Sequence, residues 1–493
     1  MTMRRALAVL LVAVCVAPLV AVAEEAVDLA TVLRKVLAAH PELDVARIDS
    51  AIADTASAQL AGMLDTRATA KAGIAQNQTP VNSSFQPIET RTAQLTAGLT
   101  KPLATGDTVG VALDYNRSKQ LFNSPFISQL AAINPSYQSQ LNISIRHPLA
   151  QGKGLPAYHQ GLRAAKARQH ASRWQQRIIA HQLALQALNL FYQLALDDIN
   201  LHFARLAVQR AERLLAYQRK REAFGLVEES DRLQAAALLA QRRTQLAEAE
   251  ARRANDQSAL NRLMLRDPDA PLRVRLPEDP PASHIPSLAQ AVDNARAHRA
   301  ELKAIEEQLQ AAEAELEIAR DKLRAQLDLV AELGTRALSG SAGTTLARTF
   351  SINDHYAALS LEFSDAIEGR AERAAVRAAE LKRERALAER RKALESIRDE
   401  LARAATQIRT LAPTLRLARV HAAAERRKFA QEMTRYRQGR SDTAKLIQFE
   451  GDLHNAELLA ELKHVQWLLA CQQYRWAQGM LLAALNVPTA NGS

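Results

Sequence analysis

The sequence is poor in aromatic residues, glycine and cysteine, and these shortages exclude several classes of protein. Aromatic side chains make up 4% of the 493 residues and there are 17 glycines, while Ala, Leu, Arg, Glu and Gln dominate, as in long helices. Of the two cysteines, Cys15 lies in an apolar N-terminal segment, so Cys471 has no intrachain partner after export. A disulfide framework and a thiolate metal site are therefore excluded.

Enzyme motifs are also lacking. Gly152-Lys153-Gly154 is not followed by the Ser or Thr that a P-loop requires, and the 12 histidines show no convincing H-x-x-x-H or H-E-x-x-H spacing. We predict that the protein is not an enzyme and that it binds no cofactor and no metal.

The charge is basic but evenly distributed. Lysine and arginine total 64 against 53 acidic residues, for a formal net charge of +11. The basic residues alternate with glutamate, as in Arg370-Ala371-Glu372-Arg373. This alternation is typical of solvated helix faces carrying (i, i+4) pairs, so we expect no nucleic-acid partner.

The N-terminus predicts export. Two arginines precede an apolar run that ends at Ala21-Val22-Ala23, an A-x-A cleavage site, so residues 1–23 are predicted to be a signal peptide. The residues before Cys15 make a poor lipobox, which argues against a lipid anchor. No later apolar run reaches the ~20 residues that a membrane-spanning helix needs.

The longest helical segment extends from Pro156 to Phe224. It has no proline after its first residue and one glycine, Gly161. The chain breaks at Phe224-Gly225-Leu226 and resumes as a helix to about Leu265, which predicts a long helical hairpin. The hairpin has an apolar seam at coiled-coil spacing, formed by Leu183, Leu190, Leu194, Leu201 and Val208.

From about Arg67 the hydrophobic period changes from 3.6 to 2. The alternating segments are centred on residues 70–74, 95–99, 109–115 and 141–145. Each places apolar residues on one face and polar residues on the other, which predicts strands.

The second half of the sequence repeats the first. Ala300-Glu301-Leu302 matches Pro41-Glu42-Leu43, two alternating segments follow, and a second long helical run ends at Gly439, which corresponds to Gly225. The predicted organisation is a signal peptide (1–23), a first repeat (24–266), a Pro-rich linker (267–286), a second repeat (287–486) and a tail (487–493).

The two repeats differ in their strands. The first has up to four and the second has two, and we assign the extra pair to residues 92–117, turning near Thr105-Gly106-Asp107. This pair adds strands to a shared sheet or forms a separate flap.

Strands of about ten residues with one apolar and one polar face are typical of a barrel in lipid with a wet lumen. A sheet packed on its own helices is the alternative. Open edges do not survive in hydrocarbon, and four to six strands enclose no aqueous channel, so such a barrel needs several copies of the chain. We predict a mainly α fold whose long hairpins form an α-barrel tunnel and whose strands join a shared outer-membrane β-barrel.

These features resemble the TolC-like outer-membrane efflux family over essentially the whole exported chain. The resemblance lies in the duplication, in Pro41-Glu42-Leu43, in the segment Pro148 to Gly154 after a strand, and in Phe224-Gly225-Leu226 before Asp231. It implies a homotrimer with a 12-stranded barrel in the outer membrane of a Gram-negative bacterium. It also implies a periplasmic tunnel that docks onto a periplasmic adaptor and an inner-membrane transporter of the RND, ABC or MFS type.

The implied function is a passive exit duct for efflux or type I secretion. A periplasmic adaptor and a structural coiled-coil protein of the envelope are the alternatives. Adaptors usually have one hairpin, a lipoyl-type half-motif and an inner-membrane anchor, whereas this chain has two hairpins. A coiled-coil protein leaves the alternating strands unexplained.

The resemblance also implies a gate at the periplasmic entrance. Asp231 and Tyr436 match the pair that bridges the entrance in the family. Lys445 and Gln448 stand where a relative has the aspartates of a cation-binding ring, so that ring is not expected here, and Arg440 and Asp442 are charged candidates nearby. Ordinary turn and cap residues are the alternative.

The hairpin tips are where family members contact the adaptor. The alternative role of these residues is to end the helices, with glycine in the left-handed region. The matching residues are Phe224, Gly225, Leu226, Gln438 and Gly439.

Overall fold

The computed structural model describes residues 25–83, 85–130, 133–277, 286–351 and 354–488. The predicted signal peptide, residues 1–23, lies outside them. The chain divides into two compact units. Of the described residues, the strand unit contains those within 41–179 and 292–399, and the hairpin unit contains those within 25–40, 180–291 and 400–488.

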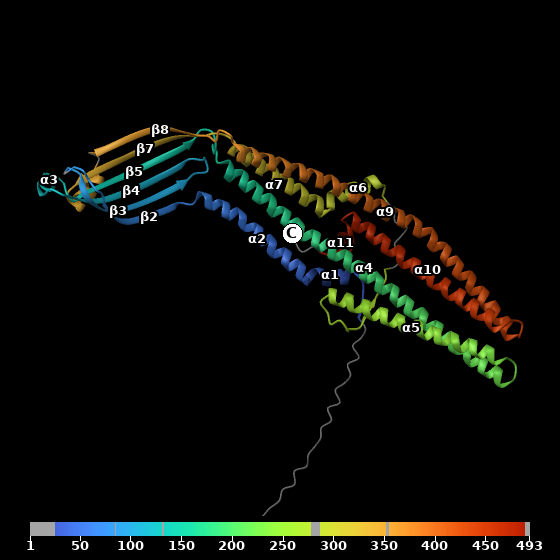
Figure 1. Ribbon diagram of the computed structural model, residues 1–493. Coiled ribbons are helices and arrows are strands. Elements are labelled where there is room, and N and C mark those ends of the chain that lie inside the picture. The colour runs from blue at the N-terminus through green and yellow to red at the C-terminus, as the bar shows by residue number, and fades with distance from the viewer. Residues whose placement is uncertain (1–24, 84, 131–132, 278–285, 352–353, 489–493) are drawn as a thin grey trace, which may run out of the picture. The chain divides into compact units, whose positions relative to one another are not determined.

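In its described residues the strand unit contains one antiparallel sheet of six strands, in the order β2-β3-β4-β5-β7-β8 (Figure 1). Every neighbour in this order except β5 and β7 is also the next strand along the chain, so the sheet is an up-and-down meander. The strands are β2 (Arg67–Gln78), β3 (Pro87–Pro102), β4 (Thr108–Phe122), β5 (Ser136–Pro148), β7 (Gln326–Ser339) and β8 (His355–Ser364).

The extra pair of the first repeat is β3 and β4, and it lies inside the sheet. The predicted turn near Thr105 is confirmed, since Leu103 N donates to Asp107 O at 2.8 Å. Gly106 at this turn has φ +99°, and a Cβ there would lie 2.7 Å from Gly152 O. Only glycine fits this left-handed position against the neighbouring backbone.

One face of the sheet is aliphatic and carries exposed side chains. At one end of this face Ser139 and Ala337 are buried, and the Ser139 hydroxyl donates to Thr345 O of α8 (Ala342–Thr349). Leu333 is 60% exposed, Leu359 72% and Phe363 69%. A sheet packed on its own helices would bury these side chains, so the described residues argue against that alternative. An exposed apolar face opposite a polar one is the pattern of a sheet that contacts lipid.

Helices of the strand unit pack through small residues. Ala164 and Ala167 of α4 form a buried cluster with Ala311 and Ala314 of α7, and such residues let helix axes approach closely. The helices of this unit are α2 (Pro41–Ala61), followed by one 3₁₀ turn (Gly62–Leu64), α3 (Pro125–Leu130), α7 (Ala300–Lys322), α8 (Ala342–Thr349) and the N-terminal parts of α4 (Pro156–Ala223) and α9 (Arg370–Arg437).

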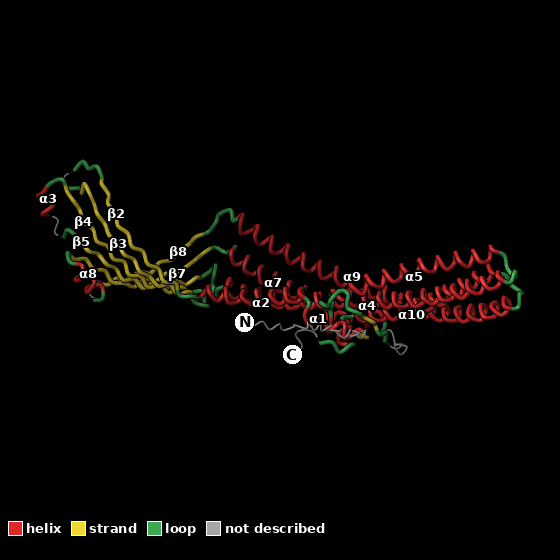
Figure 2. The backbone as a smooth tube through the Cα atoms, turned by 90° about the horizontal axis from the view of Figure 1, so that it is seen from below, coloured by secondary structure: helices red, strands yellow, loops and turns green. Residues whose placement is uncertain are grey.

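The described part of the hairpin unit contains two helical hairpins, α4 with α5 and α9 with α10, each closed by a short loop (Figure 2). Along the predicted seam Leu183, Leu194, Leu201 and Val208 are buried, while Leu190 is half-buried. The remaining helices are α1 (Leu29–Ala39), α5 (Glu229–Leu263), α6 (Leu288–His298), which begins in this unit, α10 (Thr443–Ala477) and α11 (Leu481–Ala484). No described helix combines the length and the apolar run that crossing a bilayer demands.

A small parallel sheet was not predicted. β1 (Glu25–Val27) pairs with β6 (Leu272–Val274). The residue after β6 extends this pairing, since Arg275 N donates to Val27 O at 2.8 Å. The segment 267–286, predicted as a linker, therefore includes a strand. Three-residue strands are too short to give a periodic signal.

Candidate functional site

The two hairpin tips have the same backbone geometry. In the first, Gly225 N donates to Glu222 O and Leu226 N to Arg221 O, both at 2.9 Å. In the second, Gly439 N donates to Tyr436 O at 3.0 Å and Arg440 N to Arg435 O at 2.9 Å. Both are Schellman motifs, which satisfy the last helical carbonyls by placing glycine in the left-handed region.

Apolar side chains project from the first tip. Phe224 is 79% exposed and Leu226 is 63% exposed, whereas Gln438 and Arg440 flank the glycine of the second tip and are also exposed. Gly225 has φ +66° and Gly439 has φ +72°. The glycines end the helices, and the exposed residues around them form a surface available to a partner.

Tyr436 lies at the centre of a buried polar cluster. It is 2% exposed, and Gln218 of α4 and Thr443 of α10 are also buried. The Gln218 amide donates to the Tyr436 hydroxyl and, at 2.6 Å, to Thr443 Oγ1, and the two hydroxyls lie 3.1 Å apart. These bonds connect α4, α9 and α10 close to the tips.

The structure pairs Tyr436 with Gln218 in place of Asp231. In the described part of the chain no hydrogen bond or ion pair joins Asp231 to Tyr436. Asp231 is half-buried in the first turn of α5, and its backbone N donates to Glu228 O at 3.1 Å. The tyrosine instead faces α4, one turn before that helix ends.

The other charged candidates have local partners. Asp442 is the N-cap of α10 and accepts from Lys445 N at 2.7 Å, the cap role given above as the alternative. Lys445 Nζ lies 3.7 Å from Glu432 Oε1, and Gln448 is exposed. Arg440 occupies the position after the tip glycine.

Glu432 is a buried carboxylate near the second tip that the sequence pattern did not indicate. It is 3% exposed. Its carboxylate accepts from the Ser441 hydroxyl and lies 3.7 Å from both Arg435 Nη1 and Lys445 Nζ. The carboxylate thereby connects the end of α9 to the loop and to the start of α10.

A cavity of about 350 Å³ adjoins the Tyr436 cluster inside the hairpin unit. Tyr217 and Tyr436 form part of its wall, with ring centroids 5.8 Å apart and the Arg221 guanidinium over both rings. Leu238 and Leu446 contribute aliphatic wall from α5 and α10. The cavity is lined by side chains of α4, α5, α9 and α10.

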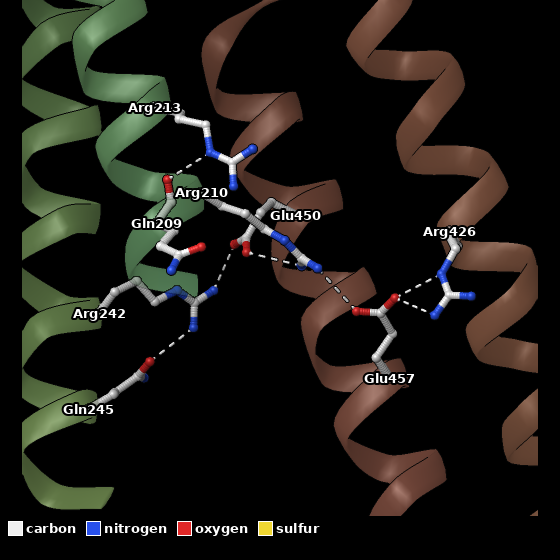
Figure 3. Close-up of polar contacts among 8 residues, drawn as sticks. All are labelled: Gln209, Arg210, Arg213, Arg242, Gln245, Arg426, Glu450 and Glu457. Atoms are coloured by element: carbon white, nitrogen blue, oxygen red, sulfur yellow. Dashed lines mark hydrogen bonds and ion pairs between the residues drawn. The ribbon is translucent and has the colours of Figure 1, made fainter. Parts of the chain in front are cut away.

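An ion network built on two buried glutamates connects all four helices further from the tips (Figure 3). Glu450 of α10 lies 2.9 Å from Arg242 of α5 and 3.8 Å from Arg210 of α4. Glu457 lies 3.2 Å from Arg210 and 2.8 Å from Arg426 of α9. Because Glu450 and Glu457 are 6% and 7% exposed, the network ties the two hairpins together where water has little access.

His454 lies in the same region of α10 and is 9% exposed. Burial, followed by the positive charges of Arg242 and Arg210, lowers the pKa of its imidazole. The neutral ring adds no further positive charge to a network that already holds three arginines.

Sequence reasoning missed Gln218, Glu432 and the ion network. Gln218 had a usable signal, because it continues the spacing of Val208, Ala211 and Leu215 and is therefore a polar residue at a seam position. No group of three or more potential ligand side chains capable of holding a metal occurs in the part of the chain that the structure describes.

The fold is similar to several solved outer-membrane proteins. The outer-membrane channel OprN superposes with a TM-score of 0.69 and 18% sequence identity. The match covers 92% of this chain and 89% of the OprN chain. The outer membrane protein VceC from Vibrio cholerae has a TM-score of 0.66 and 16% identity, with coverage of 92% and 96%. The Campylobacter jejuni CmeC outer membrane channel has a TM-score of 0.64 and 16% identity, with coverage of 94% and 87%.

At the sequence level no curated protein matches the chain. Residues 291–481 match the family model described as outer membrane efflux protein. The predicted resemblance is thereby confirmed: this chain has the fold of the TolC-like outer-membrane efflux channels, and its second half carries the sequence pattern of their family.

Proposed function

We propose that this chain is the outer-membrane duct of a tripartite efflux or type I secretion system, which receives its cargo from an inner-membrane transporter through a periplasmic adaptor. The observation that carries the proposal is the six-stranded sheet. Its aliphatic side chains are exposed on one face and its other face is polar, and the same chain contains two long helical hairpins.

The duct requires several copies of the chain. Six strands enclose no aqueous channel by themselves, and their open edges cannot remain in hydrocarbon. Three copies related by cyclic symmetry provide a closed wall, with the hairpins in the periplasm. Energy for transport comes from the inner-membrane partner, since the channel only provides a passage.

Planar-bilayer recording tests this function. The purified, folded oligomer is expected to give discrete conductance steps, and membrane fractionation is expected to recover it with the outer membrane. Recovery with the inner membrane would favour the adaptor alternative. A folded oligomer that never conducts would contradict the proposal.

We further propose that the hairpin tips contact the adaptor. Replacing Phe224 and Leu226 together by serine removes the two most exposed apolar side chains of the first tip. We expect adaptor affinity to fall at least about tenfold, since buried apolar anchors dominate such interfaces, while bilayer conductance is unchanged. Surface plasmon resonance with the cognate adaptor measures the effect.

Phe350→Ser is the matched control for the tip variant. Phe350 is 68% exposed and lies beside α8 in the strand unit. Equal loss of adaptor affinity in the control and in the tip variant would remove the tips as the contact surface.

A further inference from the structure

We propose that β2 of one chain pairs with β8 of the next, so that three chains close an 18-stranded barrel and not the 12-stranded barrel that the family resemblance implies. The inference rests on the proposed function as an outer-membrane duct. It depends on whether β3 and β4 belong to the wall or form a flap beside it.

The register of the sheet makes the extra pair part of the wall. β2 and β3 pair without interruption from Arg67↔Thr100 to Gln78↔Glu89. β4 then pairs with β5 from Thr108↔Arg146 to Ser118↔Ser136. The one register shift within β3 and β4 lies at the strand end, at Pro87. A flap would be hydrogen-bonded to the wall along only part of its length.

The aliphatic face continues across the extra pair. One cross-strand row contains Leu99, Val111, Ile143 and Leu333 from β3, β4, β5 and β7, in that order. Each of these side chains is between 39% and 60% exposed. Strands outside the wall would have no reason to continue the lipid-facing row in phase, since a slip of one residue would turn every side chain to the other face.

The polar face is continuous as well. Thr96 of β3 donates to Asp114 of β4 at 2.7 Å, and Asp114 is paired in register with Gln140 of β5. The Gln140 amide donates to the Tyr356 hydroxyl of β8 at 2.7 Å. A row of polar contacts therefore extends from the extra pair to the last strand, as expected of a wet lumen.

The two edge strands of the sheet, β2 and β8, have the directions needed to pair between copies of the chain. β2 and β8 are first and last in an antiparallel sheet of six, so they are antiparallel to each other. A second copy can therefore continue the same up-and-down pattern by placing its β8 beside β2. Both edge strands are exposed along nearly all their length, and pairing copies edge to edge removes the unpaired backbone groups that hydrocarbon does not tolerate.

The consequence is a wider opening. Barrel diameter grows roughly linearly with strand number, so 18 strands give a barrel about one and a half times as wide as 12. The hairpin tips, not the barrel, would then limit the size of the cargo.

Cysteine cross-linking tests the strand neighbours. In a Cys471→Ala background of the full chain, Leu359→Cys on β8 is combined in turn with Ala68→Cys, Ala70→Cys or Ala72→Cys on β2, all on the aliphatic face. Oxidation of the membrane-inserted protein is expected to give covalent products of up to three chains with at least one combination.

The matched series combines Leu359→Cys with Val109→Cys, Val111→Cys or Leu113→Cys on β4, and no cross-link is expected. Cross-links in this series alone would place β2 and β3 outside a 12-stranded wall and overturn the inference, although the duct would remain. Products that stop at two chains, or no products from a conducting oligomer, also overturn it. Loss of conductance from the folded Cys471→Ala parent would instead count against the proposed function.

Excision of β3 and β4 provides a second readout. Removing residues 87–122 joins the loops before β3 and after β4, leaving β2 antiparallel to β5. In bilayers, the barrel radius measured by exclusion of poly(ethylene glycol) from the outer side is expected to fall by about one third. An unchanged radius in a conducting excision variant contradicts the inference.

Discussion

Replacing Glu450 by alanine is expected to destabilise the hairpin unit by about 3–5 kcal/mol, because it leaves a buried charge without its partner. Arg242 is 9% exposed, and among the described residues it would keep one neutral hydrogen bond, to Gln245. Arg210 retains Glu457, so Arg242 accounts for most of the cost. Denaturant unfolding of the purified oligomer, followed by helical circular dichroism, measures the change.

Glu212→Ala is the matched control. Glu212 pairs with Arg243 at 2.9 Å, again between α4 and α5, but the two side chains are 47% and 62% exposed. Exposed pairs contribute about 0.2–1 kcal/mol, so this variant should unfold close to the parent. If both variants unfold alike, the network does not carry the stability assigned to it.

A double variant separates charge burial from packing. Glu450→Leu with Arg242→Met replaces the pair by apolar side chains of similar length, and such replacements of buried ion pairs are often neutral or stabilising. We expect the double variant to be more stable than Glu450→Ala. The cost of Glu450→Ala would then come from leaving the buried Arg242 unpaired.

Much of the fold could be predicted because its elements are long and strongly periodic. The break after Phe224 is a property of neighbouring residues, since glycine in the left-handed region ends a helix wherever it stands. The strands could be predicted equally well, because strict alternation of apolar and polar residues over about ten positions matches a strand and does not fit the helical period. Even the extra pair of strands could be assigned to the first repeat, since it interrupts the correspondence between the sequences of the two repeats.

The features that could not be predicted depend on residues far apart in the chain. The pairing of the extra strands within the sheet depends on the register of β2, β3, β4 and β5, which no single segment specifies. The pairing of Arg242 with Glu450 depends on how α5 packs against α10. Charges on such helices are numerous, and nothing local distinguishes a buried arginine from the exposed ones beside it.

The candidate site could be predicted only in part, for the same reason. Tyr436 could be identified from its position in the sequence, close before the tip glycine Gly439. Its hydrogen-bond partner could not be identified in this way. Gln218 and Asp231 are both polar residues close to the first tip, and only the direction in which Tyr436 faces selects Gln218. The role of this cluster as a gate is a prediction that electrical recording can decide.

Combining Gln218→Leu with Tyr436→Phe is expected to raise the resting conductance of the bilayer-inserted channel several-fold. The two changes remove the polar bonds from α4 and α9 to Thr443 while keeping the side-chain volumes similar. The hairpins are then held near their tips mainly by apolar packing around a cavity of about 350 Å³, which resists separation less than a buried hydrogen-bonded cluster does.

Single variants show how much each residue contributes to the rise in conductance. Tyr436→Phe alone leaves the Gln218 amide bonded to Thr443, so we expect a smaller rise than in the double variant. Asp231→Ala alone should conduct like the parent, because the tyrosine hydroxyl is paired with Gln218 and Thr443. A rise with Asp231→Ala equal to that of the double variant would instead assign the closing bond to Asp231, as the family resemblance implies. An unchanged double variant would mean that this cluster stabilises the hairpins without gating them.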